Sequence, residues 1–453
     1  MSRSRTDADA DAAVGDHVSH EVLIIGGGLA GLVTAASLLE LGHDDVVVAD
    51  SGTEPGGTSI WSAGWIWRYR SRDDYATYAP AGERTVQHAI WHELPTALKW
   101  LESATGPFLN AASQNPLNEG VQADVPALCA ALARQVGARS GRLRVATEIN
   151  ALERRAVGGW RAVSAAGAVI NASYVVCAGG GYGANFARIA RESGASASAQ
   201  SWWQLRNAGG SLGTTIDLAT QLGGVETGRR GECYMRATPV MAASTNHDVT
   251  SGEAPALSLA QAAELAQVYA RHAVLVDERG RRVEQPPNDW ADTQVINALA
   301  HRTGRGWLLV GPDSFGIATP HGSVGELIAA AEQAGSPVLW ATTTDLVAEL
   351  SALGVELHHD AAILAAAGKA ACAVPVVPGI TQTTGGILVD AQARVQSRDR
   401  LSHATVARLY AAGVDVGGVA AGGYASGLAQ ALALGRIAAR SIATEASRSR
   451  ECV

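Results

Sequence analysis

The sequence Glu21-Val-Leu-Ile-Ile25, followed at once by Gly26-Gly-Gly-Leu-Ala-Gly31, decides the fold of this chain of 453 residues. A short, almost continuous apolar run is typical of a parallel strand that is buried on both faces. The glycines at 26, 28 and 31 fit the pattern GxGxxG. In that pattern the first glycine permits a tight turn, the second lets the backbone approach a pyrophosphate, and the third lets helix and strand pack closely. The stretch therefore predicts the start of a Rossmann-like α/β domain.

The residues that follow complete the same pattern. Residues 29–41 are expected to form a helix, which Gly42 is placed to end, and the apolar residues 46–49 are expected to form a second buried strand. Asp50 closes that strand, at the spacing of about 20 residues from Gly31 that suits an acid hydrogen-bonded to a ribose. N–H groups at the start of the helix would face the phosphates. Together these features predict a dinucleotide site.

Composition excludes several classes of protein. Apolar residues make up 47% of the chain and charged residues 17%, which argues against disorder over its body. The formal charge of −8 includes no basic stripe, so nucleic acid is not an expected partner. The length suggests two or three domains. The five cysteines are scattered without CxxC spacing, so we expect no metal and a reducing cytoplasm.

Two segments bear on the cellular location. Residues 1–19 lack the apolar core of a signal peptide and are expected to form a disordered tail. Residues 409–435 contain a single charge, Asp415, and so imitate a membrane span. Seven glycines interrupt that stretch, whereas a spanning helix needs about 20 predominantly apolar residues. We therefore expect strand, loop and helix there, and no membrane partner.

A second glycine-rich motif carries a resemblance to a known family. The segment Gly56-Gly-Thr-Ser-Ile-Trp-Ser-Ala-Gly64 is similar to the Gly-Gly-x-Ser-x-x-Ser-x-Gly motif of the fumarate reductase/succinate dehydrogenase flavoproteins. Further segments resemble the same family as far as about residue 440. They are residues 175–180, 207–219, 383–390, 409–415 and 427–436. The resemblance implies FAD, whereas the first fingerprint alone would also allow NAD.

The resemblance also implies a domain plan. We expect a discontinuous FAD-binding domain, formed by residues 20–228 and 355–446. Residues 229–354 would form an inserted α+β domain that caps the substrate and is shorter than the family usually carries. Its strand and turn are expected at residues 273–283.

Residue roles follow from the resemblance by position. Gly26, Gly28 and Gly31 would approach the pyrophosphate, and Asp50 would bind the adenosine ribose. Asp415 would hold a ribityl hydroxyl, and the helix that starts at Gly427 would face the pyrimidine edge of the flavin. The other expected cofactor contacts are Leu29, Ala30, Ser51, Gly57, Thr58, Ser59, Ala63, Gly64, Trp65, Ile149, Ala178, Gly179 and Leu428. No histidine occurs between positions 56 and 64, where many relatives attach FAD covalently, so we expect non-covalent FAD.

The substrate side departs from the fumarate reductase pattern. Residues 381–386, 423–427 and 283–290 lack the histidines and arginines with which that family binds a dicarboxylate. A fumarate-like dianion would be desolvated there without a counter-charge, which costs several kcal/mol. Tyr424 instead resembles a tyrosine of the 3-ketosteroid Δ1-dehydrogenase branch. In that branch the hydroxyl and a glycine N–H, here that of Gly427, polarise a ketone.

The sequence gives fewer signals for the proton acceptor and for the walls of the substrate pocket than for the cofactor contacts. By alignment with the cap motif, the base falls at residues 288–290, where Asp289 is the titratable side chain. A solvated turn aspartate is the alternative. Trp61, Trp67 and Tyr69, with Trp65, would line an apolar, ring-shaped substrate pocket, although core packing explains some of them equally well.

The sequence thus predicts an FAD-dependent oxidoreductase acting on a CH–CH bond next to a carbonyl, in a small cyclic and mostly neutral substrate. An unidentified electron acceptor or donor is a partner, and a homo-oligomer is possible. The alternative is a flavin-dependent reductase of an unsaturated carboxylic acid, using cations such as Arg68, Arg70 or Arg236. A flavoprotein without turnover is a third reading.

Overall fold

The computed structural model describes most of the chain. The residues described are 19–110, 117–139, 141–240, 272–284, 292–319, 322–341, 345–358, 363, 365–366, 369–398 and 404–451. The predicted tail lies outside these residues except for Ser19, which begins the first strand. Asp289 also lies outside them.

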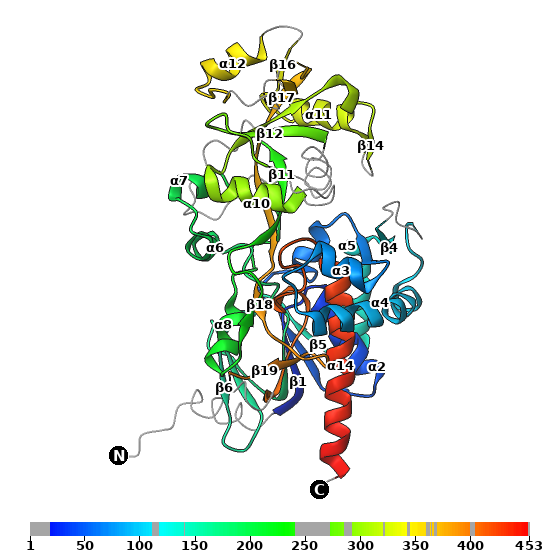
Figure 1. Ribbon diagram of the computed structural model, residues 1–453. Helices are drawn as coiled ribbons and strands as arrows, with labels where there is room; N and C mark the ends of the chain where they lie inside the picture. Colours follow the sequence, from blue (N-terminus) through cyan, green and yellow to red (C-terminus); the bar gives the residue numbers. More distant parts are fainter. Residues whose placement is uncertain are drawn as a thin grey trace, which may run out of the picture.

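The chain begins with a strand, a helix and a second strand in the predicted order, and it continues as a mixture of strands and helices (Figure 1). The strands are β1 (Ser19–Ile25), β2 (Val46–Ala49), β3 (Trp65–Tyr69), β4 (Asn118–Gln122), β5 (Arg142–Arg144), β6 (Ile149–Arg154), β7 (Trp160–Ser164), β8 (Val169–Cys177), β9 (Gln204–Leu205), β10 (Glu226–Thr227), β11 (Cys233–Pro239), β12 (Ala273–Asp277), β13 (Gly306–Val310), β14 (Ala318–Thr319), β15 (Gly322–Ser323), β16 (Leu339–Trp340), β17 (Cys372–Thr383), β18 (Gly386–Ile387), β19 (Arg394–Gln396) and β20 (Thr405–Ala411). The α-helices are α2 (Leu29–Glu40), α3 (Arg72–Tyr78), α4 (Arg84–Thr105), α5 (Val125–Ala138), α6 (Phe186–Ser193), α7 (Ala197–Gln200), α8 (Thr214–Gln221), α10 (Asp292–Arg302), α11 (Val324–Gln333), α12 (Leu346–Ala352) and α14 (Gly427–Glu451).

The larger sheet contains the two strands that the first glycine-rich motif predicts. Its main path runs in the order β19-β20-β8-β1-β2-β5, in which β20, β8, β1, β2 and β5 are parallel to one another and β19 is antiparallel to β20. Val22, Leu23 and Ile24 of β1 are fully buried, as are all four residues of β2. Burial on both faces explains why these strands read as continuous apolar runs. The carboxyl ends of β1 and β8 lead directly into the glycine-rich turns at residues 26–28 and 178–181.

The smaller sheet forms the second domain, at the top of Figure 1. It has six strands, with the order β11-β17-β13-β12 and with β16 and β9 also paired to β17. Because β17 extends from Cys372 to Thr383, this sheet continues well past the predicted boundary at residue 355. The chain also enters the sheet before residue 229, through β9. The expected α+β insert is present, but its limits follow strand pairing rather than the motif spacing.

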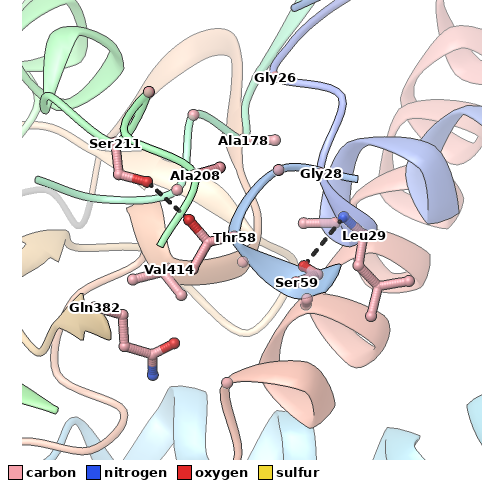
Figure 2. Close-up of a pocket in the computed structure, with 18 of the residues that line it drawn as sticks. Gly26, Gly28, Leu29, Thr58, Ser59, Ala178, Ala208, Ser211, Gln382 and Val414 are labelled. Carbon is pink, nitrogen blue, oxygen red and sulfur yellow. Dashed lines mark hydrogen bonds between the residues drawn. The ribbon is translucent and has the colours of Figure 1, made fainter. Parts of the chain in front are cut away.

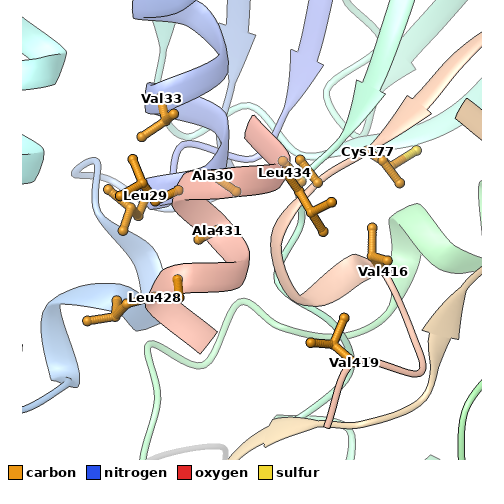
Figure 3. Close-up of a cluster of buried hydrophobic side chains, with 14 of the residues drawn as sticks. Leu29, Ala30, Val33, Cys177, Val416, Val419, Leu428, Ala431 and Leu434 are labelled. Atoms are coloured by element: carbon orange, nitrogen blue, oxygen red, sulfur yellow. The ribbon is translucent and has the colours of Figure 1, made fainter. Parts of the chain in front are cut away.

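Helices α2 and α14 pack closely against each other beside the parallel sheet. Figure 3 shows Leu29, Ala30 and Val33 of α2 facing Leu428, Ala431 and Leu434 of α14. A Cβ atom at Gly435 would lie only 2.8 Å from the carbonyl oxygen of Ala30, so the close approach requires a glycine there. Among the described residues, no helix is long and apolar enough to cross a membrane.

Candidate functional site

One large cavity lies at the carboxyl ends of the parallel strands, where ligands bind in open α/β sheets. It measures about 660 Å³ and is lined from Asp50 and Ile149 at one end to Tyr234, Gln382 and Tyr424 at the other. Figure 2 shows its central part, where Gly26, Gly28 and Ala178 lie above the loop that carries Thr58 and Ser59. The lining therefore combines segments from the whole length of the chain.

The first glycine-rich turn has the close contacts that its motif predicts. Gly26 has a φ of +115°, and a Cβ atom on it would lie 2.1 Å from the carbonyl oxygen of Ala178. A Cβ atom on Gly31 would lie 1.9 Å from the carbonyl oxygen of Gly26. Neither position can carry a side chain without moving backbone. Gly31 thus serves the packing of helix on turn and is not part of the cavity lining.

The N-terminus of α2 opens onto the cavity without a side-chain cap. Gly28 is the N-cap residue, and Gly28, Leu29 and Ala30 all line the cavity. The N–H of Leu29 donates a long hydrogen bond to Ser59 Oγ, at 3.4 Å (Figure 2). Backbone donors and the positive end of the helix dipole are the features that bind phosphate groups. This end of the cavity therefore fits a pyrophosphate.

Asp50 holds the loop that borders the adenosine end of the cavity. One of its carboxylate oxygens accepts a hydrogen bond from the N–H of Gly27, and the other accepts one from the N–H of Gly52 at 2.7 Å. Each oxygen of a carboxylate can accept more than one hydrogen bond. Because Asp50 also lines the cavity, it can bind a ribose hydroxyl while it fixes both turns.

Replacing Asp50 by alanine should therefore weaken FAD binding about tenfold to a hundredfold, since a charge-assisted hydrogen bond contributes ~1.5–3 kcal/mol. Equilibrium binding of FAD to the apoprotein measures the change. Glu54→Ala is the matched control, because Glu54 is an exposed acid of the same cavity wall. Molecules of the Asp50 variant that retain flavin should react at the wild-type rate. Equal FAD affinity in the variant and the wild type would place the ribose contact elsewhere.

A hydrogen bond joins two distant segments of the cavity wall. Thr58 Oγ1 and Ser211 Oγ lie 3.2 Å apart and form this bond (Figure 2). Thr58 belongs to the 3-10 helix Gly57–Trp61, whereas Ser211 belongs to the glycine-rich loop before α8. Both residues line the cavity, so the contact holds two parts of its wall together.

Helix α14 presents its N-terminus at the far end of the cavity. Ser426 Oγ accepts a hydrogen bond from the N–H of Ala429 at 3.2 Å, and Gly427 and Leu428 line the cavity. A Cβ atom on Gly427 would lie 2.3 Å from Gln382 Oε1, so the Gln382 amide lies directly against the start of the helix. The backbone donors and the dipole at this terminus favour negative charge in the adjoining space.

Tyr424 lies beside this helix terminus and is fixed by contacts on several sides. Its N–H donates to the carbonyl oxygen of Tyr78 at 3.1 Å, and its own carbonyl oxygen accepts the hydroxyl of Tyr69 at 2.6 Å. The ring of Trp67 packs against the Tyr424 ring with centroids 5.2 Å apart. The preceding Gly422 donates its N–H to Glu232 Oε1 at 2.9 Å. The Tyr424 ring is therefore held in place where it lines the cavity.

A second tyrosine and two arginines meet Tyr424 from the smaller domain. The Tyr234 ring stacks on the Tyr424 ring with centroids 4.8 Å apart and an angle of 11° between the planes. Arg236 Nε donates to the Tyr234 hydroxyl oxygen at 2.8 Å. Arg206 lines the cavity and is 8% exposed, and its side-chain stem crosses Gly379, where a Cβ atom would lie 2.4 Å from Arg206 Cδ. These four residues form the Tyr–Arg cluster.

The surroundings shift the pKa values of the residues in this cluster in different directions. Burial raises the pKa of Tyr234, but the Arg236 guanidinium, the Tyr424 hydroxyl and Arg206 together bring it below its usual value of 10. Burial, and then Tyr234 itself, raise the pKa of Tyr424. Burial lowers the pKa of Arg206 to about 10, which leaves this guanidinium charged at neutral pH. The substrate end of the cavity is therefore positively charged.

The sequence as a whole matches one protein family over most of its length. The family model for the FAD binding domain matches residues 21–428. The chain belongs to this FAD-binding family. The match confirms the resemblance to flavoproteins and the FAD prediction, and it extends from near the start of the first predicted part of the domain into the second. Comparison with curated protein sequences finds no match.

Solved structures of other flavoproteins share the fold. A flavocytochrome c3 fumarate reductase in an open conformation superposes with a TM-score of 0.65 at 18% identity, covering 98% of this chain and 82% of that one. The 3-ketosteroid-Δ4-(5α)-dehydrogenase of Rhodococcus jostii gives 0.66 at 15% identity, over 94% of this chain and 97% of that one. The 3-ketosteroid Δ1-dehydrogenase of Sterolibacterium denitrificans gives 0.66 at 16%, over 94% and 100%. The predicted Rossmann-like fold with a capping domain is thus confirmed.

The structure gathers most of the predicted FAD contacts of this flavoprotein around the one cavity. The predicted residues that line it are Gly26, Gly28, Leu29, Ala30, Asp50, Ser51, Gly57, Thr58, Ser59, Ala63, Trp65, Ile149, Ala178, Gly179, Gly427 and Leu428. The lining also contains Tyr424 and Trp61. These residues form an extended cavity that fits FAD along its full length. The N-termini of α2 and α14 line it where the charged groups of the cofactor would lie.

Asp415 has a different place from the one expected. Its side chain is fully buried and does not line the cavity. The carboxylate accepts hydrogen bonds from the N–H groups of Gly179 at 2.7 Å and Gly181 at 2.8 Å, and from Thr215 Oγ1 at 2.7 Å. The prediction that it binds a ribityl hydroxyl is therefore wrong for this geometry. Asp415 holds the turn after β8 that borders the cofactor space.

The structure also corrects the role predicted for the aromatic residues of β3. Trp67 and Tyr69 are buried, at 6% and 3% exposed, and lie outside the cavity lining. They pack behind Tyr424, so they support the site and do not form the wall of a substrate pocket. Gly64 also lies outside the lining, because it packs against the backbone of Ala123. Arg68 is held by Glu119, 2.7 Å from its Nε, and by the ring of Trp91.

Three cavity residues were not predicted as site residues, although Gln382 lies in the segment 381–386 that was compared with the family pattern. Tyr234, Arg206 and Gln382 lie in segments that pair across the smaller sheet, where Tyr234 is opposite Gln382 and Leu205 is opposite Ile380. Arg236 was named by the sequence analysis only as a candidate cation for an unsaturated acid. The available signal was the spacing of Tyr234 and Arg236, which suits side chains on the same face of a strand.

Proposed function

We propose that this flavoprotein oxidises a CH–CH bond next to a carbonyl, or reduces the corresponding C=C bond. The observation that supports this most directly is the position of Tyr424, whose ring lines the cavity beside the N-terminus of α14. A carbonyl oxygen placed there would meet the Tyr424 hydroxyl and the N–H groups at Gly427. Donors placed where an enolate develops stabilise the transition state for breaking the neighbouring C–H bond.

When bound, FAD supplies a two-electron acceptor or donor for a hydride at the carbon β to the carbonyl. The chain's own residues bind and orient the substrate. Tyr424 donates to the carbonyl oxygen, and the dipole of α14 favours negative charge next to Gly427. The Tyr–Arg cluster excludes bulk water from one side and adds positive charge.

The test is anaerobic mixing of the oxidised holoenzyme with cyclic ketones, monitored by loss of the flavin absorbance. Reduction of the flavin by a saturated ketone, with formation of the α,β-unsaturated ketone, supports dehydrogenation. The reverse direction is tested with the photoreduced protein and unsaturated ketones. A flavin that is reduced and reoxidised by no carbonyl compound would leave a flavoprotein without turnover as the better reading.

A second candidate is reduction of an unsaturated carboxylic acid, and the two arginines of the Tyr–Arg cluster favour it. Arg206 is 8% exposed and Arg236 is 8% exposed, and the guanidinium of Arg236 lies 5.5 Å from the Tyr424 ring centroid. A carboxylate accepts paired hydrogen bonds from a guanidinium. Unsaturated acids therefore belong in the same panel as the ketones. Faster reoxidation by an acid than by its neutral ester would favour this candidate.

We propose that FAD is held without a covalent bond. The described residues that line the cavity include no histidine and no cysteine, which supports this mode. Acid precipitation of the purified yellow protein should release FAD, and not FMN, into the supernatant. Chromatography of the supernatant identifies the nucleotide. Flavin that stays with the precipitated polypeptide would contradict the non-covalent mode.

We further propose a small-molecule substrate and a separate electron acceptor or donor, with a homo-oligomer as one possible state. Cys129, Cys177, Cys233 and Cys372 are buried thiols without disulfide bonds, which supports a cytoplasmic location for this protein.

A further inference from the structure

We propose that Glu232 positions Tyr424 by holding the backbone of the loop just before it, so that the smaller domain sets the place of the carbonyl donor. Glu232 lies immediately before β11, and its Oε1 accepts the N–H of Gly422 at 2.9 Å. Gln294 of α10 contacts the same residue, because its Nε2 donates to the carbonyl oxygen of Gly422. The inference rests on the proposed function and adds a positioning residue to it.

The loop that carries Tyr424 is held from both domains. From the FAD-binding domain, Ala81 donates its N–H to the carbonyl oxygen of Ala421 at 3.1 Å, and Tyr78 accepts the N–H of Tyr424 at 3.1 Å. Between these two contacts, Gly422 has a φ of +77°, a left-handed conformation that glycine adopts without strain. Its N–H and its carbonyl oxygen are both bonded to side chains of the smaller domain. This one residue therefore connects the smaller domain to the loop of the carbonyl donor.

Glu232 is itself fixed to the smaller sheet through its backbone. Its carbonyl oxygen accepts the N–H of Thr384, which directly follows β17, at 3.0 Å. The next residue, Cys233, is tied to α10, because the Asn297 side chain accepts its N–H at 3.1 Å and donates to its carbonyl oxygen at 2.6 Å. The Glu232 side chain is 12% exposed. A movement of the smaller sheet would therefore carry this carboxylate with it.

The effect on the reaction comes through the place of the Tyr424 hydroxyl. Tyr424 lies two residues after Gly422, so a shift of the Gly422 backbone moves the tyrosine that lines the cavity. A catalytic group displaced by about 1 Å can cost up to about 10² in rate. Glu232 and Gly422 both lie outside the cavity lining, so neither contacts FAD there. Loss of the Glu232 bond should therefore lower the rate and leave FAD content unchanged.

Because a carboxylate makes this contact, its strength depends on pH. Burial raises the pKa of Glu232 above its ordinary value of 4.5, although the N–H that it accepts and the guanidinium of Arg229, 3.7 Å away, act in the opposite direction. Burial also raises the pKa of the adjoining Cys233 thiol, and on α10 it lowers the pKa of His301, so both are uncharged at neutral pH. As the pH falls through the pKa of Glu232, the charge-assisted bond to the N–H becomes a weaker neutral one.

The first test does not need a substrate. Hydrogen–deuterium exchange of the holoenzyme is measured by mass spectrometry in peptides that cover residues 418–426. Glu232→Ala should speed exchange in this segment by about tenfold to a hundredfold, because one charge-assisted hydrogen bond no longer opposes its opening. Glu232→Gln should have a smaller effect, since its amide oxygen can still accept the N–H. Glu278→Gln is the matched control, because Glu278 is another acid of the smaller domain with a pKa raised by burial, and its charged neighbours include Arg305. Equal exchange in the wild type and Glu232→Ala would overturn the proposal.

The second test measures the maximal rate of flavin reduction against pH, with any ketone that reduces the flavin in anaerobic mixing. The wild-type rate should rise as the pH rises through the pKa of Glu232, whereas Glu232→Gln should lack this rise and keep one lower rate. Glu232→Ala should be ~10–10²-fold slower than the wild type at neutral pH. Identical pH profiles in the wild type and Glu232→Gln would overturn the proposal. Failure of every ketone would count against the proposed function, whereas the exchange experiment would still decide whether Glu232 holds the loop.

Discussion

Tyr424→Phe should reduce the rate of flavin reduction by a ketone by ~10²–10³-fold, as loss of one donor to a developing oxyanion typically does. The loss should fall mainly on the maximal rate and much less on substrate affinity, because the hydrogen bond strengthens toward the transition state. Rapid anaerobic mixing over a range of ketone concentrations separates the two. FAD content should be unchanged, since the ring that packs on Trp67 is retained.

The contacts of Tyr424 also supply a comparison variant. Tyr69→Phe is a useful comparison. Among the described residues, the Tyr69 hydroxyl donates a hydrogen bond only to the backbone carbonyl oxygen of Tyr424. It should have a smaller effect on rate. Unchanged kinetics in Tyr424→Phe would reduce Tyr424 to a packing residue and favour the unsaturated-acid reductase.

Asp415→Ala should lower the free energy of unfolding by about 2–6 kcal/mol, from two buried amides that each lose a partner at about 1–3 kcal/mol. The amides are those of Gly179 and Gly181, and the Thr215 hydroxyl loses its acceptor too. Since Gly179 lines the cavity, FAD retention should fall in parallel. Denaturant unfolding and flavin content measure the two effects.

Asp390→Ala is the matched control for that variant. Asp390 also accepts backbone N–H groups, from Gln392 at 2.9 Å and Arg394 at 3.0 Å, but it lies in a turn outside the cavity lining. Its replacement should cost less stability and should leave flavin content unchanged. An Asp415 variant as stable as the control would show that the turn after β8 is held by other contacts.

The nucleotide half of the site could be predicted because its function depends on backbone geometry. Gly26 permits a tight turn, Gly31 permits close packing of helix on turn, and Asp50 follows at a fixed distance along the chain. Each of these requirements can be recognised in the local sequence. The family match over residues 21–428 confirms the resemblance on which the longer plan rested. The same reasoning failed for Asp415, because its position in the motif does not say whether its carboxylate faces the cavity or the neighbouring turn.

The substrate half could not be predicted in the same way. Tyr234 and Arg206 reach the cavity through pairing of β11 and β9 with β17, where Tyr234 is opposite Gln382 and Leu205 is opposite Ile380, far along the chain. Register across such a distance depends on packing of the whole smaller sheet. Trp65, Trp67 and Tyr69 alternate along β3, as side chains on one face of a strand do. The alternation did not reveal that Tyr424 lies between this strand and the cavity. Trp67 and Tyr69 therefore support Tyr424 and do not line the cavity.

The tight contact between α2 and α14 fixes the position of one helix relative to the other. Both helices begin at the cavity, and the small residues Ala30 and Gly435 bring their axes so close that neither can slide without a backbone clash. The two positively polarised helix ends thus keep a fixed position relative to each other. A ligand that carries negative charge opposite both ends can contact both at once, so the packing of two small residues determines which spacing of charges this cavity favours.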